Sequence, residues 1–537
     1  MSLSVFLPAN PDSPSAVLTA HTQLHAHLLS TGAYQPFVYP YRALGPNILI
    51  AYLLLPPVDR SRYPRLAAAV HHARWAVLAA MTWFCGWAMV ECRSPMVTIG
   101  YGVGLIMAWS LLWGWTLIVA FEVRERAERM EGRGSDRHAG QDSEVKGEDA
   151  GSEPVNGEAG DGLRRRMISK ADGKTHDDTG DDGEPRFKWQ KLPPTLWHRV
   201  DWVTDLVTNF RGVRWSHQLS GLPYPDVSSP SAFAEPISHQ ISTVAISSSK
   251  SRPSRYPTRS ALLRYNLINF LVTFIVLDII KLITLKDPYY WGLSTLSPSP
   301  FPHPRTPRMY LSLVTLFTSL NIIFTLPPII FSYGAGERFL GEHAWPWLYP
   351  PLFSSPKKIW THGLAGFWGG WWHPMFRLAF EQLGEAIVKP LGWEKNTVTG
   401  GILRVVLAFV ASGTLHASGS YTSLGETQPL NEFLFFAVQP VGILTQRALA
   451  QWMKTNGLRD RTPAAVRGAA NVAFVMAWFW LTAPTVSDDF ALSGVWLYEP
   501  FPISPSRGLV GDGWWRWGGP WCRWHSDEKW WKSGLAF

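Results

Sequence analysis

The sequence predicts an all-α fold, a polytopic membrane protein that crosses the bilayer with about eight helices. Two observations carry this prediction. The apolar residues make up 46% of the 537 residues and gather in runs of about 20, the length that a helix needs to cross about 30 Å of hydrocarbon. Polar connections separate these runs, and basic residues cluster beside them, as Lys and Arg do where they face lipid headgroups.

The N-terminal part, residues 1–123, is predicted to hold the first membrane helices. Its lead, Met1–Gln35, is polar and has no basic stretch followed by an apolar core, so we expect no secretory signal peptide. The first apolar run, Pro36–Leu55, contains an arginine and prolines but is long enough to span. The clearer runs are Ala73–Val90 and Met96–Phe121, and glycines in the second permit close helix packing.

Residues 124–195 have a different composition, rich in Gly, Asp, Glu, Lys and Arg and nearly without large apolar side chains. Such a segment cannot bury a core, so we expect a disordered polar loop. In Leu196–Pro223, which follows, Trp202, Leu206 and Phe210 recur at four-residue spacing with polar residues between them. This pattern is typical of an amphipathic helix at the membrane interface.

A basic element with the sequence R-G-V-R-W, residues 211–215, ends this stretch. Contact of Arg211 and Arg214 with lipid headgroups is the simpler interpretation. The alternative is contact with an anionic ligand such as the phosphates of coenzyme A, which the planar guanidinium group recognises well.

Residues 196–483 are predicted to form the functional core and residues 484–537 a Trp-rich tail. Tryptophan and arginine together prefer the membrane interface, so we expect the tail to lie there. Asp278 and Lys281, three residues apart in the first span of the core, can form an ion pair on one helix face. The predicted spans of the core are Ala261–Thr284, Leu311–Tyr333, Gly401–Gly419, Leu430–Ala448 and Ala469–Ala483.

An aromatic stretch, Thr361–Arg377, lies between apolar runs and has the sequence T-H-G-L-A-G-F-W-G-G-W-W-H-P-M-F-R. Pro374 disfavours helical geometry at His373, so we expect the helix to break there. Non-helical backbone at membrane depth must be buried in protein or line a wet cavity. The alternative is an interfacial belt of tryptophans that happens to include a histidine.

A second histidine, His416, lies inside the next apolar run, among small residues. Small side chains leave volume for a ligand or for a close-packed helix. An ionisable residue at membrane depth is costly and therefore a candidate for function, and neutral imidazole can act as a general base. A hydrogen bond to a neighbouring helix is the alternative, and the question is whether His373 and His416 form one site.

Several classes of site are not expected. The net charge is +8, but basic residues lie beside apolar runs, so we expect no nucleic-acid partner. Cys85, Cys92 and Cys522 have neither zinc-ligand spacing nor a disulfide framework, and we expect no metal and no bound cofactor. No Ser-His-Asp or G-x-S-x-G pattern indicates a covalent intermediate.

The sequence F-W-G-G-W-W-H at residues 367–373, with Arg377, resembles the F-W-G-x-x-W-H…R motif of fungal wax synthase-like acyltransferases. These are relatives of the membrane-bound O-acyltransferases. His416 follows in an apolar helix, as the second histidine does in that superfamily, and R-G-V-R-W is similar to the R-G-x-G-W element of fungal members. The resemblance covers roughly Trp197 to Ala483.

Three positions depart from the family pattern. Trp371 stands where Arg or another polar residue is usual, Pro374 where Gln is common, and Arg214 where glycine is expected. These changes leave the reaction class intact and bear on the acyl-chain and acceptor preference.

The resemblance implies a membrane O-acyltransferase, in the endoplasmic reticulum, with acyl-CoA, preferably acetyl-CoA, as co-substrate. The acceptor it implies is a lipophilic alcohol such as a terpenoid or meroterpenoid of secondary metabolism. His416 would be the catalytic base and His373 a catalytic hydrogen-bond donor. A long-chain wax ester synthase is one alternative, and a transporter or membrane scaffold is another. Substrate and acyl-CoA binding would fall to Trp368, Trp372, Arg377, Arg211 and Trp215.

Overall fold

The computed structural model describes residues 2–9, 11, 13–132, 187–222, 258–293, 299–300, 303–393, 397–518 and 522–537. Among these residues, seven helical segments are long and apolar enough to cross a membrane, close to the eight expected. The predicted fold class, a polytopic α-helical membrane protein, is confirmed.

The elements follow one another along the described chain, beginning with a mainly helical N-terminal part. This part contains α1 (Pro14–Ser30), β1 (Gln35–Pro36), β2 (Val38–Tyr39), α2 (Leu44–Leu53), α3 (Pro64–Glu91), β3 (Cys92–Arg93), α4 (Val97–Trp115), the π-helical η3 (Thr116–Ala120), α5 (Val123–Arg126) and β4 (Arg129–Gly132).

The second half of the described chain is also helical and ends in two short strands. It contains β5 (Phe187–Gln190), α7 (Leu196–Thr208), α8 (Arg259–Thr284), α9 (Arg305–Pro327), the π-helical η8 (Pro328–Ala335), α10 (Gly336–Leu340), α11 (Lys357–Gly366), the π-helical η11 (Phe367–Trp371), α12 (Arg377–Val388), α13 (Val398–Thr422), α14 (Pro429–Ala437), α15 (Gln439–Thr455), α16 (Leu458–Arg461), α17 (Ala464–Leu492), α18 (Pro505–Leu509), β6 (Arg523–His525) and β7 (Gly534–Ala536). Single 3₁₀ turns occur at Leu3–Val5, Tyr41–Ala43, Pro288–Trp291, Gly341–Ala344, Pro346–Leu348, Val495–Leu497 and Trp530–Lys532.

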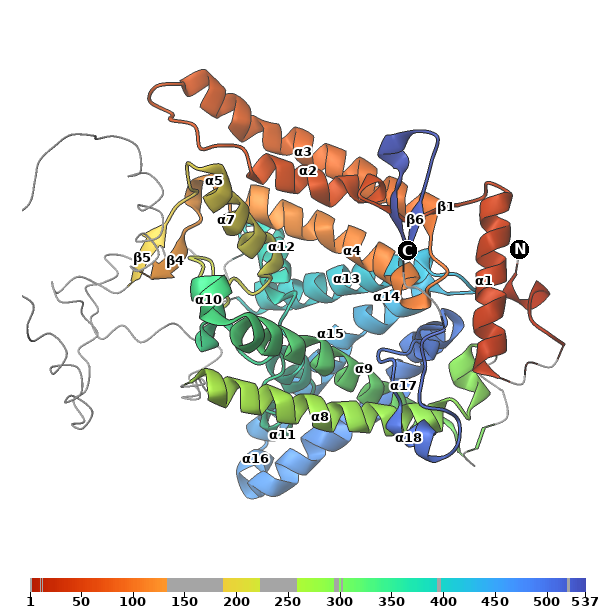
Figure 1. Cartoon of the computed structure of the whole chain (residues 1–537). Coiled ribbons are helices and arrows are strands. Elements are labelled where there is room, and N and C mark those ends of the chain that lie inside the picture. The colour runs from red at the N-terminus through yellow and green to blue at the C-terminus, as the bar shows by residue number, and fades with distance from the viewer. Residues whose placement is uncertain are drawn as a thin grey trace, which may run out of the picture.

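Among the described residues, three small sheets join distant parts of the chain. β1 pairs in parallel with β3, β2 pairs with β7 and β7 with β6, and β4 pairs with β5. Because β7 lies at the C-terminus and β2 near the N-terminus, the two ends of the chain are held together. Figure 1 shows the C-terminus beside the N-terminal elements.

The predicted span Pro36–Leu55 is wrong. This segment forms β1, β2 and then α2, a helix of only 10 residues, which is too short to cross a bilayer. Pro40 cannot donate a helical hydrogen bond and disfavours helical geometry at Tyr39, so no helix runs through the segment. Pro46 lies near the start of α2, where proline is tolerated.

The disordered loop predicted for residues 124–195 is ordered at both ends. α5 follows η3, and β4 pairs antiparallel with β5, with Arg129 opposite Gln190. Arg129 also forms ion pairs with Glu131 and with Asp201 of α7, at 2.6 and 2.7 Å. Burial raises the pKa of Asp201, but hydrogen bonds from His343 and Arg129 outweigh it and leave that pKa well below its usual value. Residues 133–186 lie outside the described residues.

Two further predictions, the environment of α7 and the limit between core and tail, also differ from the structure. The apolar face of the amphipathic helix α7 packs against other helices, with Trp202 and Leu206 almost fully enclosed, while Leu196 and Trp197 at its start are exposed. The predicted limit between core and tail at residue 483 falls inside α17, which continues to Leu492 with Pro484 in its interior. Proline is tolerated inside membrane helices where neighbouring groups satisfy the freed backbone carbonyl.

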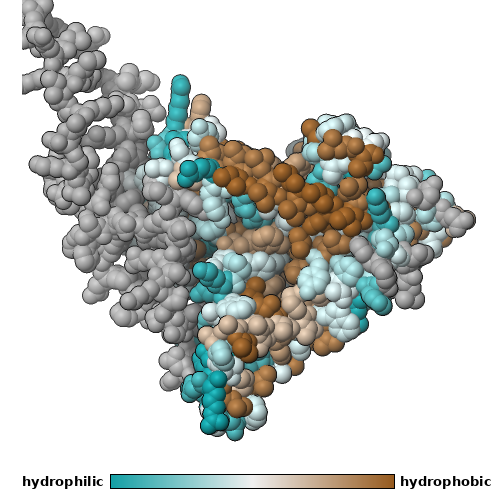
Figure 2. Space-filling view, turned by 90° about the horizontal axis from the view of Figure 1, so that it is seen from below, coloured by the Kyte–Doolittle hydropathy of each residue, from teal (hydrophilic) through white to brown (hydrophobic). Residues whose placement is uncertain are grey.

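Figure 1 shows α4 and α13 side by side near the middle of the molecule, with the α2–α3 pair on one side and α8 on the other. The face over α8, seen from below in Figure 2, is largely apolar. The exposed side chains of α8 there are large and aliphatic, as expected of a surface in contact with lipid tails. They include Ile268, Leu271, Val272, Ile275 and Ile279.

The contact between α4 and α13 brings two backbones together. A Cβ atom added at Gly104 would lie 1.8 Å from the carbonyl oxygen of Ser418. The hydroxyl of Thr422 donates to the carbonyl of Gly100 at 2.7 Å and accepts from the N–H of Gly104 at 2.9 Å. Small residues at such crossings allow the close approach that stabilises helix pairs in membranes.

We expect Gly104→Ala to destabilise the protein, because the added methyl group forces α4 and α13 apart. Overpacking of this kind costs about 1–3 kcal/mol, which should lower the melting temperature of the protein purified in detergent. Gly102→Ala, in the same helix but with open space around its Cβ position, is the matched control. Equal melting temperatures for the two variants would contradict this view of the α4–α13 contact.

Candidate active site around His373 and His416

The helix opens at His373, as Pro374 predicts. α11 passes into the π-helical turn η11, and the N–H of Trp372 donates to the carbonyl of Phe367 at 2.7 Å, which closes that turn. Trp372 then has an extended backbone, with φ −64° and ψ 148°. The chain becomes helical again only at Arg377, so the backbone of His373 lies in a break between two helices.

Aromatic rings surround His373. Its ring centroid lies 5.1 Å from that of Trp372, 5.9 Å from Phe376 and 6.2 Å from Phe353. Within the described part of the chain, the buried Nδ1 atom of His373 has no hydrogen-bond partner. A buried nitrogen without a partner costs free energy, so a polar group placed beside this atom would be bound favourably.

His416 is held by three side chains. Its Nδ1 atom lies 2.8 Å from the hydroxyl oxygen of Tyr101, which donates to Oε2 of Glu432 at 2.6 Å. The ring stacks on Phe436, with centroids 4.4 Å apart and planes at 18°. The Glu432 side chain is fully buried, but 26% of the His416 side chain is exposed. One nitrogen of His416 is therefore fixed while part of the ring stays accessible.

The small residues around His416 bring the neighbouring helices close. A Cβ atom at Gly419 would lie 2.7 Å from the ring of Tyr101, and one at Gly413 would lie 2.9 Å from the carbonyl oxygen of Phe433. The sequence left open whether these small residues leave room for a ligand or allow close helix packing. Gly413 and Gly419 allow close helix packing. That packing places Tyr101 of α4 and Glu432 of α14 next to His416 of α13.

A continuous series of ring contacts joins the two histidines. Trp372, which touches His373, lies 6.2 Å from Trp368, and Trp368 lies 6.0 Å from Phe436, on which His416 stacks. The structure thus brings His373, Trp372, Trp368 and His416 together in one aromatic region.

Arg377 lies at the edge of this region and braces it. Its Nε atom donates to Glu381 at 2.6 Å, and its guanidinium group also donates to the carbonyl of Gly369 at 3.3 Å. Because Gly369 belongs to η11, Arg377 ties the π-helical turn to the start of α12.

Arg211 and Trp215 lie in a different packing group. Arg211 donates to the carbonyl oxygens of Pro350 and Pro351, at 2.8 and 3.0 Å, and burial lowers the pKa of its guanidinium group to about 10. Trp215 is fully buried, with its ring 4.7 Å from Trp202. Through these two hydrogen bonds, Arg211 holds the chain segment that leads to Phe353, the residue in contact with His373.

Sequence analysis missed Tyr101, Glu432 and Gln439. Glu432 is an acidic residue within a predicted span, so the argument that singled out His416 applied to it as well. The amide oxygen of Gln439 accepts from the indole N–H groups of Trp368 and Trp478, both at 3.1 Å. Tyr101 carried no local signal, because its partner lies 315 residues away in the sequence.

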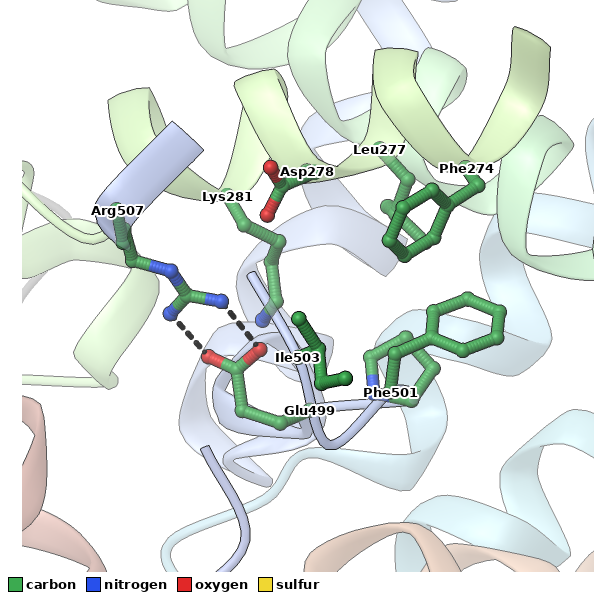
Figure 3. Close-up of a pocket in the computed structure, with 9 residues that line it drawn as sticks. Phe274, Leu277, Asp278, Lys281, Glu499, Phe501, Ile503 and Arg507 are labelled. Carbon is green, nitrogen blue, oxygen red and sulfur yellow. Dashed lines mark hydrogen bonds and ion pairs between the residues drawn. The ribbon is translucent and has the colours of Figure 1, made fainter. Parts of the chain in front are cut away.

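Two further features concern metal binding and a second cavity. Among the residues that the structure describes, no group of three or more His, Cys, Asp or Glu side chains is placed to hold a metal ion. A separate small cavity lies between α8 and the C-terminal segment (Figure 3), where Arg507 forms two hydrogen bonds with Glu499, at 2.7 and 2.8 Å.

The residues of that cavity fasten the C-terminal segment to α8. Lys281 donates to the carbonyl of Trp496, and Asp278 accepts from Ser504 and from the backbone of Ser506. The predicted ion pair between Asp278 and Lys281 is therefore wrong, because each side chain is used by the C-terminal segment. The cavity lies apart from both histidines.

Comparison with known proteins gives matches over part of the chain. The model of the "Membrane bound O-acyl transferase family" matches residues 349–438, a segment that contains His373, His416 and Glu432. Acetyltransferase sirH of Emericella nidulans is 32% identical over 83 residues, which are 15% of this chain and 19% of that protein.

Two further relatives come from other fungi. Acetyltransferase spyB of Aspergillus fumigatus is 26% identical over 110 residues, 20% of this chain and 18% of that protein. Acetyltransferase ataH of Aspergillus terreus is 26% identical over 149 residues, 27% of this chain and 47% of that protein. The chain thus spans less than half the length of each of these curated relatives.

We expect Gln439→Leu to destabilise the aromatic region, because two indole N–H groups and the Phe435 carbonyl lose their partner. Each unsatisfied buried group costs about 1–3 kcal/mol, so the melting temperature should fall and the tryptophan fluorescence should change. Gln451→Leu, at an exposed position of the same helix, is the control. Identical melting of the two variants would show that Gln439 does not hold the indoles.

Proposed function

We propose that the protein is a membrane-embedded O-acyltransferase that moves an acyl group from acyl-CoA to a hydroxyl group of a lipophilic acceptor. One observation carries the proposal: His416 is anchored through Nδ1 by Tyr101 and Glu432, next to an aromatic region that contains His373. An imidazole with one nitrogen fixed and part of its ring accessible is suited to general-base catalysis. The family match over the same segment supports this assignment.

In this reaction one proton moves twice, first from the acceptor hydroxyl to His416 and then from His416 to coenzyme A. His416 takes the hydroxyl proton of the acceptor while the oxygen attacks the thioester carbonyl carbon, so an O–C bond forms. The C–S bond then breaks, and the thiolate of coenzyme A takes the proton back from the imidazolium, leaving ester and free thiol. His373 donates a hydrogen bond to the carbonyl oxygen as negative charge develops on it. Holding both substrates in one dry region supplies further rate enhancement.

The acyl group we propose is acetyl, and the acceptor is a terpenoid or meroterpenoid alcohol of secondary metabolism in the endoplasmic reticulum membrane. The acetyltransferase names of the three fungal relatives support the acetyl group. The aromatic and aliphatic lining near the histidines supports a lipophilic acceptor. Trp368 and Trp372 form the wall that the acceptor contacts, and Arg377 supports that wall.

Arg211 affects acyl-CoA binding through the chain segment that it holds. Arg211 fastens Pro350 and Pro351, and this segment leads to Phe353 beside His373. The effect of Arg211 on the thioester is therefore exerted through the position of His373. Trp215, which packs against Trp202, contributes to acyl-CoA binding only by stabilising the element that contains Arg211.

We expect membranes that contain the protein to acetylate a terpenoid alcohol with acetyl-CoA, and to use palmitoyl-CoA and a fatty alcohol poorly. Product formation is measured by mass spectrometry with each donor and acceptor pair. Preference for palmitoyl-CoA with the fatty alcohol would identify a wax ester synthase. Absence of transfer with every pair would favour a transporter or scaffold.

We expect His416→Ala to lower kcat by about 10²–10⁴-fold, the contribution of a positioned general base. His373→Ala should lower it by about 10²–10³-fold, the effect of losing one oxyanion donor. His362→Ala, an exposed position on α11, should leave turnover and abundance unchanged. Full turnover by His416→Ala at normal abundance would exclude it as the base.

A further inference from the structure

A second carboxyl group lies behind Glu432. The side chains of Glu432 and Asp489 lie near each other where α14 packs against α17, and both residues are fully buried. Asp489 stands near the end of α17, beyond the predicted limit of that helix. Helices α4, α13, α14 and α17 therefore meet at a line of four side chains: His416, Tyr101, Glu432 and Asp489.

Each carboxyl group has one oxygen with a known donor. Oε2 of Glu432 accepts from the Tyr101 hydroxyl, and Oδ1 of Asp489 accepts from the backbone N–H of Gln428. Oε1 of Glu432 and Oδ2 of Asp489 are buried, and no hydrogen-bond donor reaches them among the described residues. Two carboxyl groups in contact repel each other when both are ionised. One proton shared between Oε1 and Oδ2 would remove the repulsion and satisfy both atoms.

The shared proton determines the next hydrogen bond. Since that proton lies on the Asp489 side, Oε2 of Glu432 remains an acceptor for Tyr101. A tyrosine hydroxyl has only one proton, and Tyr101 uses it on Glu432. Toward His416 the same oxygen can therefore only accept, and the Nδ1 atom of His416, 2.8 Å away, must carry the hydrogen.

We infer that Tyr101 is a positioning residue that fixes the tautomer of His416, with the hydrogen on Nδ1 and the lone pair on Nε2. The inference rests on the proposed function in one respect: general-base catalysis requires that lone pair. In serine proteases a carboxylate holds the imidazole tautomer directly. Here a neutral hydroxyl stands between, and the nearest Glu432 oxygen lies 3.9 Å from Nδ1.

The direct test is ¹⁵N NMR of the full-length protein, labelled with ¹⁵N-histidine and reconstituted in lipid. The chain has 16 histidines, so the His416 signals are identified by their loss in His416→Ala. We expect a protonated Nδ1 and an unprotonated Nε2 in the native protein, and a mixture of tautomers in Tyr101→Phe. A hydrogen on Nε2 in the native protein, or an unchanged tautomer in Tyr101→Phe, would overturn the inference. This readout holds whether or not acyl transfer is found.

The kinetic test uses variants that keep the shape of the side chains. Tyr101→Phe should lower kcat by about 10–100-fold, as when an imidazole loses the partner that orients it, with KM unchanged. Tyr290→Phe removes another buried hydroxyl, which donates to the Arg308 carbonyl at 3.1 Å, and should leave kcat unchanged. Equal kcat values for the two variants would contradict the role of Tyr101.

Glu432→Gln separates positioning from charge stabilisation. The amide of glutamine can donate to Asp489 and accept from Tyr101, as the protonated carboxyl group does, so kcat should stay within a few-fold of the native value. Glu432→Leu has no acceptor and should lose as much kcat as Tyr101→Phe, with no further loss in the double variant. A loss in Glu432→Gln as large as in His416→Ala would assign Glu432 a charged role and overturn the inference.

Discussion

The contact between α4 and α13 is the constraint on which the candidate site depends. At Gly104 the two helices approach so closely that no side chain fits between them, and the Thr422 hydroxyl is inserted into the hydrogen bonding of α4. This approach sets the distance between Tyr101 and His416, which lie on the facing helices. The sequence left open whether the small residues around His416 leave room for a ligand or for a close-packed helix, and Gly419 allows the Tyr101 ring to approach closely.

The aromatic region depends on a second constraint, the opening of the helix after η11. The turn ends where Pro374 prevents helical geometry at His373, and Arg377 ties the turn to the next helix. Gln439 holds two indoles from the side, so Trp368 stays between Trp372 and Phe436. His373 lies in the break after η11 and His416 lies in α13, and these rings give both histidines a common wall.

Features that depend on local sequence were predictable, and features that depend on helix packing were not. Long apolar runs predicted most of the spans, and Pro374 predicted the break at His373, because each acts on its immediate neighbours. The prediction for Pro36–Leu55 failed because it rested on length and hydropathy, which do not reflect that Pro40 disfavours helical geometry at Tyr39. The ordered ends of the polar segment 124–195 were not predicted either, because β4 pairs with β5 and residues 133–186 separate these two strands in the sequence.

The line from His416 to Asp489 joins four helices, so no window of sequence contains it. Glu432 alone had a local signal, an acidic residue in an apolar run. The predicted span Ala469–Ala483 ends before Asp489, whereas α17 continues to Leu492. Arg211 shows the converse case: its charge suggested contact with lipid headgroups or, alternatively, with an anionic ligand, whereas two of its N–H groups bind backbone carbonyl groups.

The central claim is that His373 and His416 serve one reaction centre. The most direct measurement is an electron cryo-microscopy structure in a lipid nanodisc with a hydrolysis-resistant acetyl-CoA analogue. We expect the analogue's carbonyl group to lie within hydrogen-bond distance of His373, with its carbonyl carbon facing Nε2 of His416. An analogue bound at another face of the helices, with both histidines in contact only with protein, would contradict the claim.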